Sequence, residues 1–594
     1  MQTIEYSADL CVIGGGLAGV CCAIAAARHG SRVVLMQERP MLGGNASSEN
    51  RMWVSGAHGK NNRETGIIEE IVLENLYRNP TKNFYIWDSI LLDFVKREKN
   101  ITLFLNTTCM DADIICAEYP YGRSRKILSV KGYQMTTQRF IKVSAKLFAD
   151  CSGDSILAPL SGAEFDYGRE SKEEFSEDTR LSSRDNMVMG MSCLIQGRET
   201  TQSIKFTPSE FVTEITDEHV ANRPMDIYDS TENFWYLELG GTENTIDDAE
   251  DTKDKLIPLA LGVWNYIKNS GKYNADTWEL DFLGAFPAKR ESRRMRGEYV
   301  VSQRDISDNV RFEDTVAFGG WPIDDHFPLG YYHSGTPNTD IPTPSPYCLP
   351  YRALYSKNVD NLYFAGRNIS MTHMAMSSIR VMATCALLGQ AVGNAASLAA
   401  KYDITPHDVY LSHMEELQSA LLNDDCFLPY IRRHVSSACK TADLIGADDS
   451  VRSGEDRANR TYGTEDCGYM VENGTSVLYR LPSPQKVSAV HIVFDSDLER
   501  ETLPGDECQR YHATRANTLL NTPQVYVPKT LCRAFALKIK TPEGEKTLLS
   551  ATENIKRAHH VLIPEALDVL EISLTVLSNW GESEKTKIIS FDFS

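Results

Sequence analysis

The sequence lacks several features that would place it in common protein classes. A formal net charge of −20 leaves no surplus of Lys and Arg, and such a surplus is what binds phosphate backbones, so we expect no nucleic-acid partner. No apolar run reaches the roughly 18 to 20 residues that cross a bilayer, which predicts no membrane partner. The first residues enter a predicted strand at once and leave no room for a signal peptide. We therefore expect a cytoplasmic protein.

Paired cysteines are also missing. The chain has 14 cysteines, but they form no CxxC pair and none of the close His/Cys spacings that zinc and iron–sulfur sites need. We therefore expect reduced thiols and no metal. Cys21 and Cys22 are adjacent and leave a redox pair open, although their small-residue surroundings favour simple packing.

The 594 residues exceed what one hydrophobic core usually supports, so length suggests about two to four structural units. Residues 8–14, 17–29 and 32–37 have the pattern of strand, helix and strand, and the alternation continues to about 105. A strand at 361–366 and an Ala-rich helix at 380–402 return to this pattern, and the helix composition is typical of burial against a sheet.

Between about 170 and 310 the pattern is mixed and polar. It predicts a charged loop over 247–255 and a helix over 256–269. Beyond about 430, short alternating runs separated by Pro, Gly and Asp are typical of an all-β sandwich. These predicted strands cover 488–496, 523–528, 534–540, 559–564, 569–578 and 588–593.

The predicted fold class is therefore α/β, followed by all-β. We expect a Rossmann-like domain in two parts, an inserted α+β substrate domain and a C-terminal β-sandwich. The corresponding boundaries are 1–170 and 311–430 for the two Rossmann-like parts, 171–310 for the insertion and 431–594 for the sandwich.

A GxGxxG motif follows the first predicted strand directly. Gly14 permits the tight turn, Gly16 lets the backbone approach a pyrophosphate, and Gly19 lets the helix pack on the strand. The helix N-terminus offers unpaired N–H groups to the anion, and Glu38 ends the second strand where a carboxylate would bind an adenosine ribose. Together these residues predict a dinucleotide site.

Three further pieces distinguish FAD from a nicotinamide cofactor. Gly43 and Gly44 give a second close backbone approach, and residues 146–154 form a strand that runs into a Gly-containing turn. The third piece is the stretch from Asn361 to Gly393, far downstream. A simple nicotinamide dehydrogenase does not need these three segments.

At these residues the sequence resembles the FAD-dependent oxidoreductase family related to the fumarate reductase and succinate dehydrogenase flavoproteins. The resemblance covers most of 1–430, including KRESRRMRGEY from Lys289, GGWPIDDHFPLG from Gly319 and YCLPYRALYSKNVDNLYFAGR from Tyr347. It implies FAD as the cofactor and a flavin bound between the two Rossmann-like parts.

The resemblance also implies roles for individual residues. Glu38 and Arg39 would lie by the adenosine, residues 44–46 by the diphosphate, and Asp154 near the ribityl chain. The helix entered near 378–381 would direct its N-terminus at the flavin pyrimidine ring, where reduced flavin carries negative charge. The full set of expected cofactor-binding residues is Gly14, Gly16, Leu17, Ala18, Gly19, Glu38, Arg39, Gly43, Gly44, Asn45, Ala46, Arg51, Asp154, Gly366, Arg367, Ser378, Ile379 and Val381.

Two histidines are candidates for proton transfer. His373 lies between flavin-loop residues and titrates in a range that suits an acid or a base, although a backbone hydrogen bond would explain it equally. His326 follows Asp324 and Asp325, either of which could orient it, unless this is a solvent-facing turn. His373, His326 and Arg380 are our catalytic candidates.

Several arginines could also have either a site role or a structural role. Arg380 and Arg51 could clamp a carboxylate or support the flavin. Arg290, Arg293 and Arg294 form a dense basic group, which we interpret as the salt-bridged face of a helix. Their expected partners are Glu291 and Glu298.

The C-terminal segment resembles galactose-binding-like, discoidin-type sandwiches. Trp580, Tyr511 and His512 are then candidate sugar contacts, but the domain could equally cap the enzyme or bind a second subunit, giving a homo-oligomer.

The leading hypothesis is an FAD-dependent oxidoreductase that moves a hydride between flavin N5 and a small polar metabolite. The appended sandwich favours a carbohydrate or glycoside alcohol, with an unknown electron acceptor. A fumarate-like enoate reductase is the second hypothesis. A non-catalytic carbohydrate-binding or scaffold protein is the third.

Overall fold

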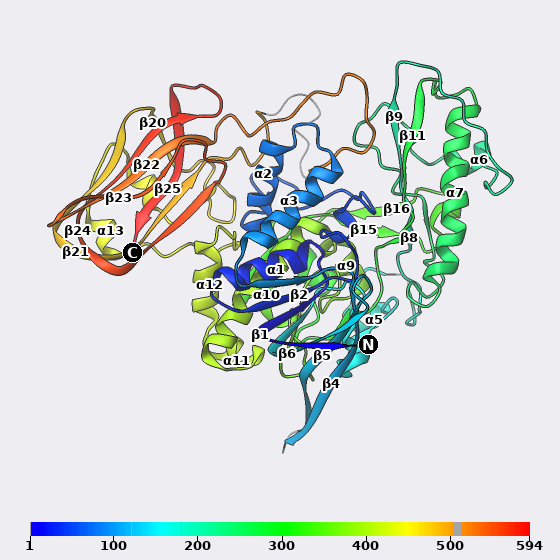
Figure 1. Cartoon of the computed structure of the whole chain (residues 1–594), viewed down its shortest axis with the longest axis horizontal. Coiled ribbons are helices and arrows are strands. Elements are labelled where there is room, and N and C mark those ends of the chain that lie inside the picture. The colour runs from blue at the N-terminus through cyan, green and yellow to red at the C-terminus, as the bar shows by residue number, and fades with distance from the viewer. Residues whose placement is uncertain (1, 120–121, 180, 503–512) are drawn as a thin grey trace. The chain divides into compact units, whose positions relative to one another are not determined.

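A computed structural model describes residues 2–119, 122–179, 181–502 and 513–594 (Figure 1). The chain divides into two compact units. Unit 1 contains Met1–Ala57, Thr81–Met414 and Tyr511–Pro523, and unit 2 contains His58–Pro80, Glu415–Arg510 and Gln524–Ser594.

This division differs from the boundaries expected from sequence. Residues 171–310 belong to the same compact unit as the Rossmann-like parts, and helix α2 (Ile67–Arg78) belongs to unit 2. Leu73 and Leu76 of α2 are part of the hydrophobic core of unit 2, and Glu69 forms a buried ion pair with Arg500 at 2.5 Å. Contacts remote in sequence therefore set these boundaries.

Unit 1 is built on a seven-stranded sheet with the order β3-β2-β1-β6-β5-β4, in which β18 also pairs with β6. The pairs β1–β2, β2–β3, β1–β6 and β6–β18 are parallel, which confirms the predicted α/β, Rossmann-like fold. The sequence pattern missed the antiparallel hairpin of β4 and β5. The strands are β1 (Thr3–Ile13), β2 (Val33–Met36), β3 (Ile101–Phe104), β4 (Thr107–Tyr119), β5 (Gly122–Gln134), β6 (Arg139–Asp150) and β18 (Leu362–Phe364).

Two apolar helices, α1 (Leu17–Arg28) and α10 (Met382–Tyr402), pack against each other beside this sheet (Figure 1). A Cβ added at Gly389 would lie 2.0 Å from the Ala18 carbonyl oxygen, so only glycine allows this approach. The predicted burial of the Ala-rich helix is confirmed. Cys21 and Cys22 are fully buried within the same packing.

The inserted region contains one long helix, α7 (Ala249–Asn269), next to a two-stranded sheet of β9 (Ile195–Glu199) and β11 (Trp278–Leu283). The expected charged loop over 247–255 is wrong for most of its length, because α7 begins at Ala249. Glu250 and Asp251 occupy the first turn, where the positive end of the helix dipole favours acidic side chains. Apolar residues of α7 pack into a core with Trp278 and Tyr236.

Short elements complete unit 1. Its remaining helices are α3 (Phe84–Arg97), α4 (Leu157–Ser161), α5 (Lys172–Phe175), α6 (Asp217–Val220), α8 (Gln303–Ser307), α9 (His373–Ile379) and α11 (Pro406–Ser412). Its remaining strands are β7 (Phe165–Asp166), β8 (Met191–Ser192), β10 (Glu238–Leu239), β12 (Ala288–Lys289), β13 (Arg294–Met295), β14 (Thr315–Gly319), β15 (Ile323–His326), β16 (Asn338–Ile341) and β17 (Tyr347–Pro350).

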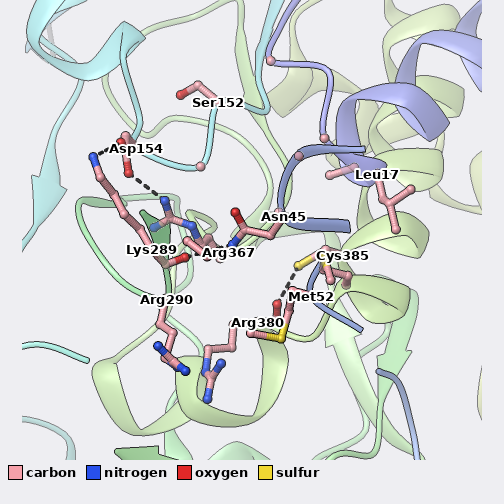
Figure 2. A pocket seen from close by; sticks show the side chains of 18 of the residues that line it. Leu17, Asn45, Met52, Ser152, Asp154, Lys289, Arg290, Arg367, Arg380 and Cys385 are labelled. Atoms are coloured by element: carbon pink, nitrogen blue, oxygen red, sulfur yellow. Dashed lines mark hydrogen bonds and ion pairs between the residues drawn. The ribbon is translucent and has the colours of Figure 1, made fainter. Parts of the chain in front are cut away.

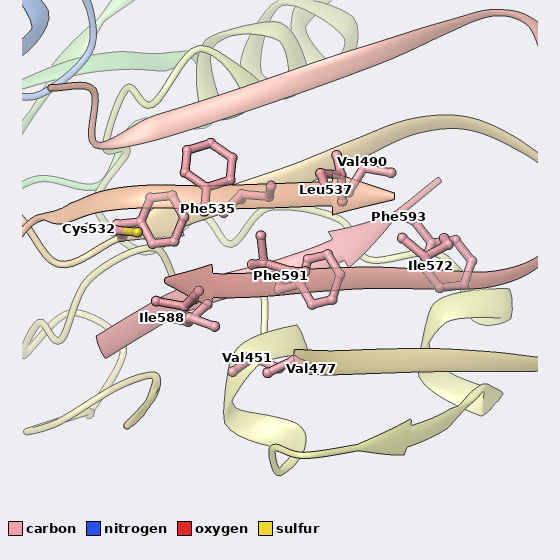
Figure 3. Packing of buried hydrophobic residues seen from close by; sticks show 14 of the residues in the cluster. Val451, Val477, Val490, Cys532, Phe535, Leu537, Ile572, Ile588, Phe591 and Phe593 are labelled. Atoms are coloured by element: carbon pink, nitrogen blue, oxygen red, sulfur yellow. The ribbon is translucent and has the colours of Figure 1, made fainter. Parts of the chain in front are cut away.

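Unit 2 is dominated by a seven-stranded antiparallel sheet with the order β20-β25-β21-β24-β22-β23, with β19 paired to β21. Val490, Phe535, Ile572 and Phe591 belong to its apolar core (Figure 3). The predicted all-β region is thus confirmed. The elements are β19 (Asp443–Ile445), β20 (Tyr469–Glu472), β21 (Ser476–Phe494), β22 (Cys532–Thr541), β23 (Gly544–Ala551), β24 (Ala558–Asn579) and β25 (Lys585–Phe593), with helices α12 (Met414–Asn423) and α13 (Ser437–Thr441).

One expected strand is absent from the described part of this unit. Residues 523–528 form no strand, because Pro523 and Pro528 lack the N–H groups that a ladder needs. The two runs predicted over 559–564 and 569–578 are parts of the single long strand β24. Tyr511 and His512 lie outside the described residues. Trp580 donates its indole N–H to the Asn554 carbonyl at 2.7 Å and packs at the core edge.

Two histidines make unit 2 sensitive to acid. His560 of β24 lies opposite His491 of β21, and burial lowers the pKa of both His559 and His560 to about 4. Because these folded-state pKa values lie below the ordinary value near 6.5, the unfolded chain binds more protons between those limits. We expect unit 2 to lose stability as the pH falls from about 6.5 to 4.

Hydrogen exchange of the β21 and β24 amides measures this effect. The protection lost on acidification should be smaller in His560→Gln, whereas His434→Gln, which changes an exposed histidine, should behave like wild type. Equal acid sensitivity in His560→Gln and wild type would contradict the assignment.

Among the described residues, no single helix is long and apolar enough to cross a membrane. The bent pair α9 and α10 meets the length and composition criteria only when its two helices are combined across a 96° break.

Candidate functional site

A cavity of about 530 Å³ lies in unit 1 where β1, β2 and β6 end. Ile13, Met36 and Cys151 mark those strand ends in its wall. Open α/β sheets bind their ligands outside the carboxyl ends of the strands, and the volume falls in the range of small-molecule sites. The cavity is therefore the candidate active site.

The glycine motif forms the wall next to α1. Gly16 is the N-cap of α1, and an added Cβ would meet no described atom within 4 Å, so its open side faces the cavity. Gly19 does not line the cavity. Its added Cβ would lie 1.8 Å from the Gly14 carbonyl oxygen, which shows that its role is close packing of the helix on the loop.

Glu38 and Arg39 follow β2 and line the cavity together. The Arg39 guanidinium lies over the Phe286 ring at 4.4 Å and 3.6 Å from the Glu49 carboxylate. Its Nε and Nη1 atoms are buried and have no hydrogen-bond partner among the described residues. Such groups cost free energy unless a ligand pairs with them.

The second glycine loop, residues 43–46, contributes residues 43–45 to the next part of the cavity wall. Gly43 has a φ of 104°, a left-handed conformation that favours glycine, and leads into a short 3₁₀ turn over 44–46. The Asn45 amide donates to the Lys289 carbonyl at 3.1 Å, and the Ser48 N–H donates to Asp88 of α3 at 3.1 Å. Burial raises the pKa of Asp88 to about 6.

A compact ion cluster lies across the cavity from the glycine loops. Asp154 accepts from Lys289 at 2.7 Å and from Arg367 at 2.6 Å (Figure 2). Burial alone would raise the pKa of Asp154, but these two cations hold it well below its ordinary value. Two cations on one carboxylate leave a local positive charge.

Helix α10 directs its N-terminus into the same cavity. Val381 is its N-cap, Met382 and Cys385 belong to its first turn, and all three line the wall. The N-terminus of a helix carries roughly half a positive charge, which favours an anion or a ring that gains negative charge. The predicted helix begins at Met382, and its N-terminus lines the cavity.

These features fit FAD. The cavity has an open glycine backbone for a diphosphate, unpaired Arg39 nitrogens and a helix N-terminus, and its charge balance is positive in an acidic chain. Six basic side chains line it, Arg39, Lys289, Arg290, Arg293, Arg367 and Arg380, against four acidic ones, Glu38, Asp154, Asp324 and Asp340.

His326 brings a titratable group to one end of the cavity. It is buried, with Nδ1 2.6 Å from Glu238 Oε2 and Nε2 3.3 Å from Asp324 Oδ2. Burial alone would lower the pKa of His326, but the carboxylates of Glu238 and Asp324 raise it overall. The imidazole is thus held in place by two acids.

Arg290 and Arg380 line the same cavity as His326, and Figure 2 shows the two arginines close together. Arg290 donates to Ser192 Oγ at 2.8 Å and to the Trp235 carbonyl at 2.7 Å. Arg380 donates to Asp324 Oδ2 at 3.0 Å, and its buried Nε has no hydrogen-bond partner among the described residues. Both guanidinium groups can still bind a ligand.

His373 lies behind this wall and is not among the residues that line the cavity. Its Nδ1 is 2.8 Å from Glu291 Oε2 and its Nε2 is 3.0 Å from Asp325 Oδ1. Burial alone would lower the pKa of His373, but Glu291 and Asp325 raise it to about 10. His373 is therefore an imidazolium at neutral pH.

Most residues expected to bind the cofactor come together in the cavity wall. These are Gly14, Gly16, Leu17, Ala18, Glu38, Arg39, Gly43, Gly44, Asn45, Asp154, Gly366, Arg367 and Val381. Five others, Gly19, Ala46, Arg51, Ser378 and Ile379, lie outside the wall. Arg51 is instead packed over the Phe282 ring at 4.2 Å and donates to Gln196.

The interpretation of residues 290–294 as a helical face is wrong. Residues 290–293 lie between strands β12 and β13, and Arg294 begins β13. Arg290 and Arg293 line the cavity, whereas the fully buried Arg294 pairs with Glu170 and Glu291. Glu298 contacts Tyr355 and His407 instead. Because these residues form no helix, the 3.6-residue repeat that would place the arginines on one face is missing.

Sequence analysis missed Glu238, Trp235 and Lys289 as site residues. The stretch around Lys289 carried a visible signal in its dense basic run. Glu238 and Trp235 lie in a mixed polar segment with no motif, and only the pairing of β10, β8 and β12 brings Trp235 to the cavity and Glu238 to His326.

The family described as FAD dependent oxidoreductase matches residues 9–421. No curated protein matches the chain.

Among solved structures, the FrdA subunit of E. coli quinol fumarate reductase is 11% identical, with a TM-score of 0.28, covering 71% of this chain and 75% of its own. Mycobacterium smegmatis Sdh1 in complex with UQ1 is 14% identical, with a TM-score of 0.26, covering 71% and 77%. The family 32 carbohydrate-binding module of Streptococcus pneumoniae EndoD is 13% identical, with a TM-score of 0.19, covering 27% and 99%. At these scores the similarities carry no argument about substrate.

The family match spans most of the chain, including the glycine loops and the helix that meets the cavity. The non-catalytic alternative is therefore set aside. The chain belongs to the FAD dependent oxidoreductase family and is a flavoenzyme with FAD as its cofactor.

Proposed function

We propose that this flavoenzyme oxidises a secondary alcohol of a small polyhydroxylated molecule, with a carbohydrate or glycoside as the favoured class. When bound, FAD supplies the hydride acceptor. The chain's own residues bind and orient the alcohol and take its hydroxyl proton. The observation that carries the proposal is the buried His326, held by Glu238 and Asp324 at the cavity wall.

As a general base, neutral His326 would exchange its longer contact, from Nε2 to Asp324 at 3.3 Å, for the substrate hydroxyl, while Glu238 holds Nδ1. Glu238 accepts the Gly190 N–H at 2.6 Å through its other oxygen, so the carboxylate and the imidazole are both fixed in orientation. An oriented base within reach of a hydroxyl accelerates proton transfer by about 10²- to 10⁴-fold. The proton of the substrate hydroxyl would pass from its oxygen to His326.

The surrounding wall suits a polyhydroxylated substrate. Trp235 and Trp321 provide apolar ring surface, and Asp324, Asn338 and Asp340 provide hydrogen-bonding groups in the same cavity. Sugars present both an apolar C–H face and many hydroxyls, so this combination matches them.

Anaerobic mixing with a panel of neutral sugars and glycosides tests the proposal. We expect at least one compound to bleach the visible flavin absorbance, and oxygen or an artificial acceptor to restore it. The same compound should bleach the flavin of His326→Gln about 10²- to 10⁴-fold more slowly. Bleaching by dithionite but by no member of the panel would overturn the substrate class.

A second candidate function is reduction of a fumarate-like enoate, which the Arg290 and Arg380 pair favours. Two guanidinium groups at one end of a cavity suit a carboxylate. Protonated His326 would then donate a proton as the hydride arrives. Fumarate should reoxidise the dithionite-reduced protein without oxygen, and failure to do so would remove this candidate.

A further inference from the structure

The strand that carries His326 has little support of its own. β15 has four residues and pairs only with β16 among the described strands, in a two-stranded sheet. An isolated two-stranded ribbon is marginally stable. The position of His326 in the cavity must therefore depend on side-chain contacts that hold β15 from outside.

Three consecutive residues of β15 make these contacts. Asp324 accepts from Arg380 at 3.0 Å, Asp325 contacts His373 at 3.0 Å, and His326 contacts Glu238 at 2.6 Å. Because side chains alternate along a strand, Asp325 points to the opposite side from its neighbours. It ties β15 to the first residue of α9, away from the cavity.

His373 is itself firmly anchored. Its backbone N–H donates to Glu170 at 2.8 Å, and its Nδ1 is 2.8 Å from Glu291, whose carboxylate also pairs with Arg294. The side chain is only 2% exposed in its rigid surroundings. The other ring nitrogen of His373, Nε2, contacts Asp325 and so connects this anchored residue to β15.

We propose that His373 is a positioning residue that holds β15 against α9 through Asp325 and thereby determines where the His326 imidazole stands in the cavity. This inference rests on the proton-transfer role proposed for His326. His373 itself touches neither the cavity nor a ligand in it. A displacement of about 1 Å in a catalytic group can cost roughly 100-fold in rate, so a remote link of this kind matters.

Two matched variants separate the two hydrogen bonds of His373. A glutamine amide nitrogen can reach the place of Nε2 and keep the link to Asp325. An asparagine amide reaches only the place of Nδ1. It therefore keeps the contact with Glu291 and loses the contact with Asp325 of β15. We expect His373→Asn to lower kcat by about 10- to 100-fold with little change in KM. His373→Gln should stay close to wild type.

The decisive measurement needs no substrate. Histidine-labelled protein is titrated by NMR in its FAD-loaded form, with the His326 signal assigned through His326→Gln. If His326 leaves its carboxylate partners, its pKa should fall toward the ordinary value near 6.5 in His373→Asn and not in His373→Gln. Because this titration involves no turnover, a wrong substrate class leaves the result unaffected.

The proposal is overturned if both variants give the His326 titration of wild type, or if both shift it equally. Should His373→Asn fail to fold, Asp325→Ala cuts the same link from the strand. An unchanged His326 titration in that variant would also overturn the proposal. A double-mutant cycle should give less than additive losses, because the two changes remove one link.

Discussion

Gly16→Val is expected to yield a folded protein that purifies without yellow colour. Gly16 has φ −64° and ψ 177°, which any residue can adopt, and an added Cβ meets no described atom within 4 Å. The valine side chain therefore fits the FAD-free protein but occupies the space where the backbone must approach the diphosphate. We expect FAD affinity to fall by about 100-fold or more, which equals about 2.7 kcal/mol.

The ratio of flavin absorbance to protein after gel filtration measures this loss, and circular dichroism checks the fold. Gly19→Ala is the matched comparison. Its Cβ would lie 1.8 Å from the Gly14 carbonyl oxygen, so the helix must shift, and we expect a stability loss of about 1–3 kcal/mol together with loss of FAD. Stoichiometric FAD in Gly16→Val would show that the diphosphate does not bind at this loop.

His326→Gln is expected to bind FAD normally and to reduce it about 10²- to 10⁴-fold more slowly with the alcohol substrate. The glutamine amide nitrogen takes the place of Nε2 and can keep the hydrogen bond to Asp324, but it cannot accept the hydroxyl proton. His29→Gln changes an exposed histidine in unit 1 and should leave the rate unchanged. Stopped-flow measurement of flavin reduction without oxygen gives the rate directly.

The pH dependence provides a second test with a definite sign. A base works only when neutral, and the carboxylates around His326 raise its pKa above the ordinary value near 6.5. Alcohol oxidation should therefore slow as the pH falls through a pKa above 6.5, and this limb should vanish in His326→Gln. If His326→Gln keeps both the wild-type rate and the decrease in rate at low pH, His326 is not the base.

The cofactor half of the site could be predicted because its residues are nearly contiguous. Gly14, Gly16 and Glu38 occur within one strand–helix–strand segment, and the chemistry of each position follows from local backbone geometry. Gly366 and Val381 are remote, but their own strand-to-helix pattern indicated their place. Local periodicity also predicted β1, α1, β2 and α10.

The residues proposed to act on the substrate were harder to predict from the sequence. His326 was visible because two acids precede it, but sequence left open whether Asp324 or Asp325 contacts it. Alternation along β15 decides this: Asp324 shares the side of His326, whereas Asp325 faces His373. The same alternation separates His373 from the cavity, although its neighbours along the chain suggested that it lay there.

Sequence alone therefore determined the family, the cofactor and the strand ends where it binds, because glycine geometry and strand–helix periodicity are local properties. Tertiary structure decided which polar groups surround the reacting end of the cavity. Glu238 and His326 are 88 positions apart and meet only through the folding of the insertion. The physical reason is that a buried imidazole takes its charge and orientation from neighbours in space, and no periodicity along the chain encodes those neighbours.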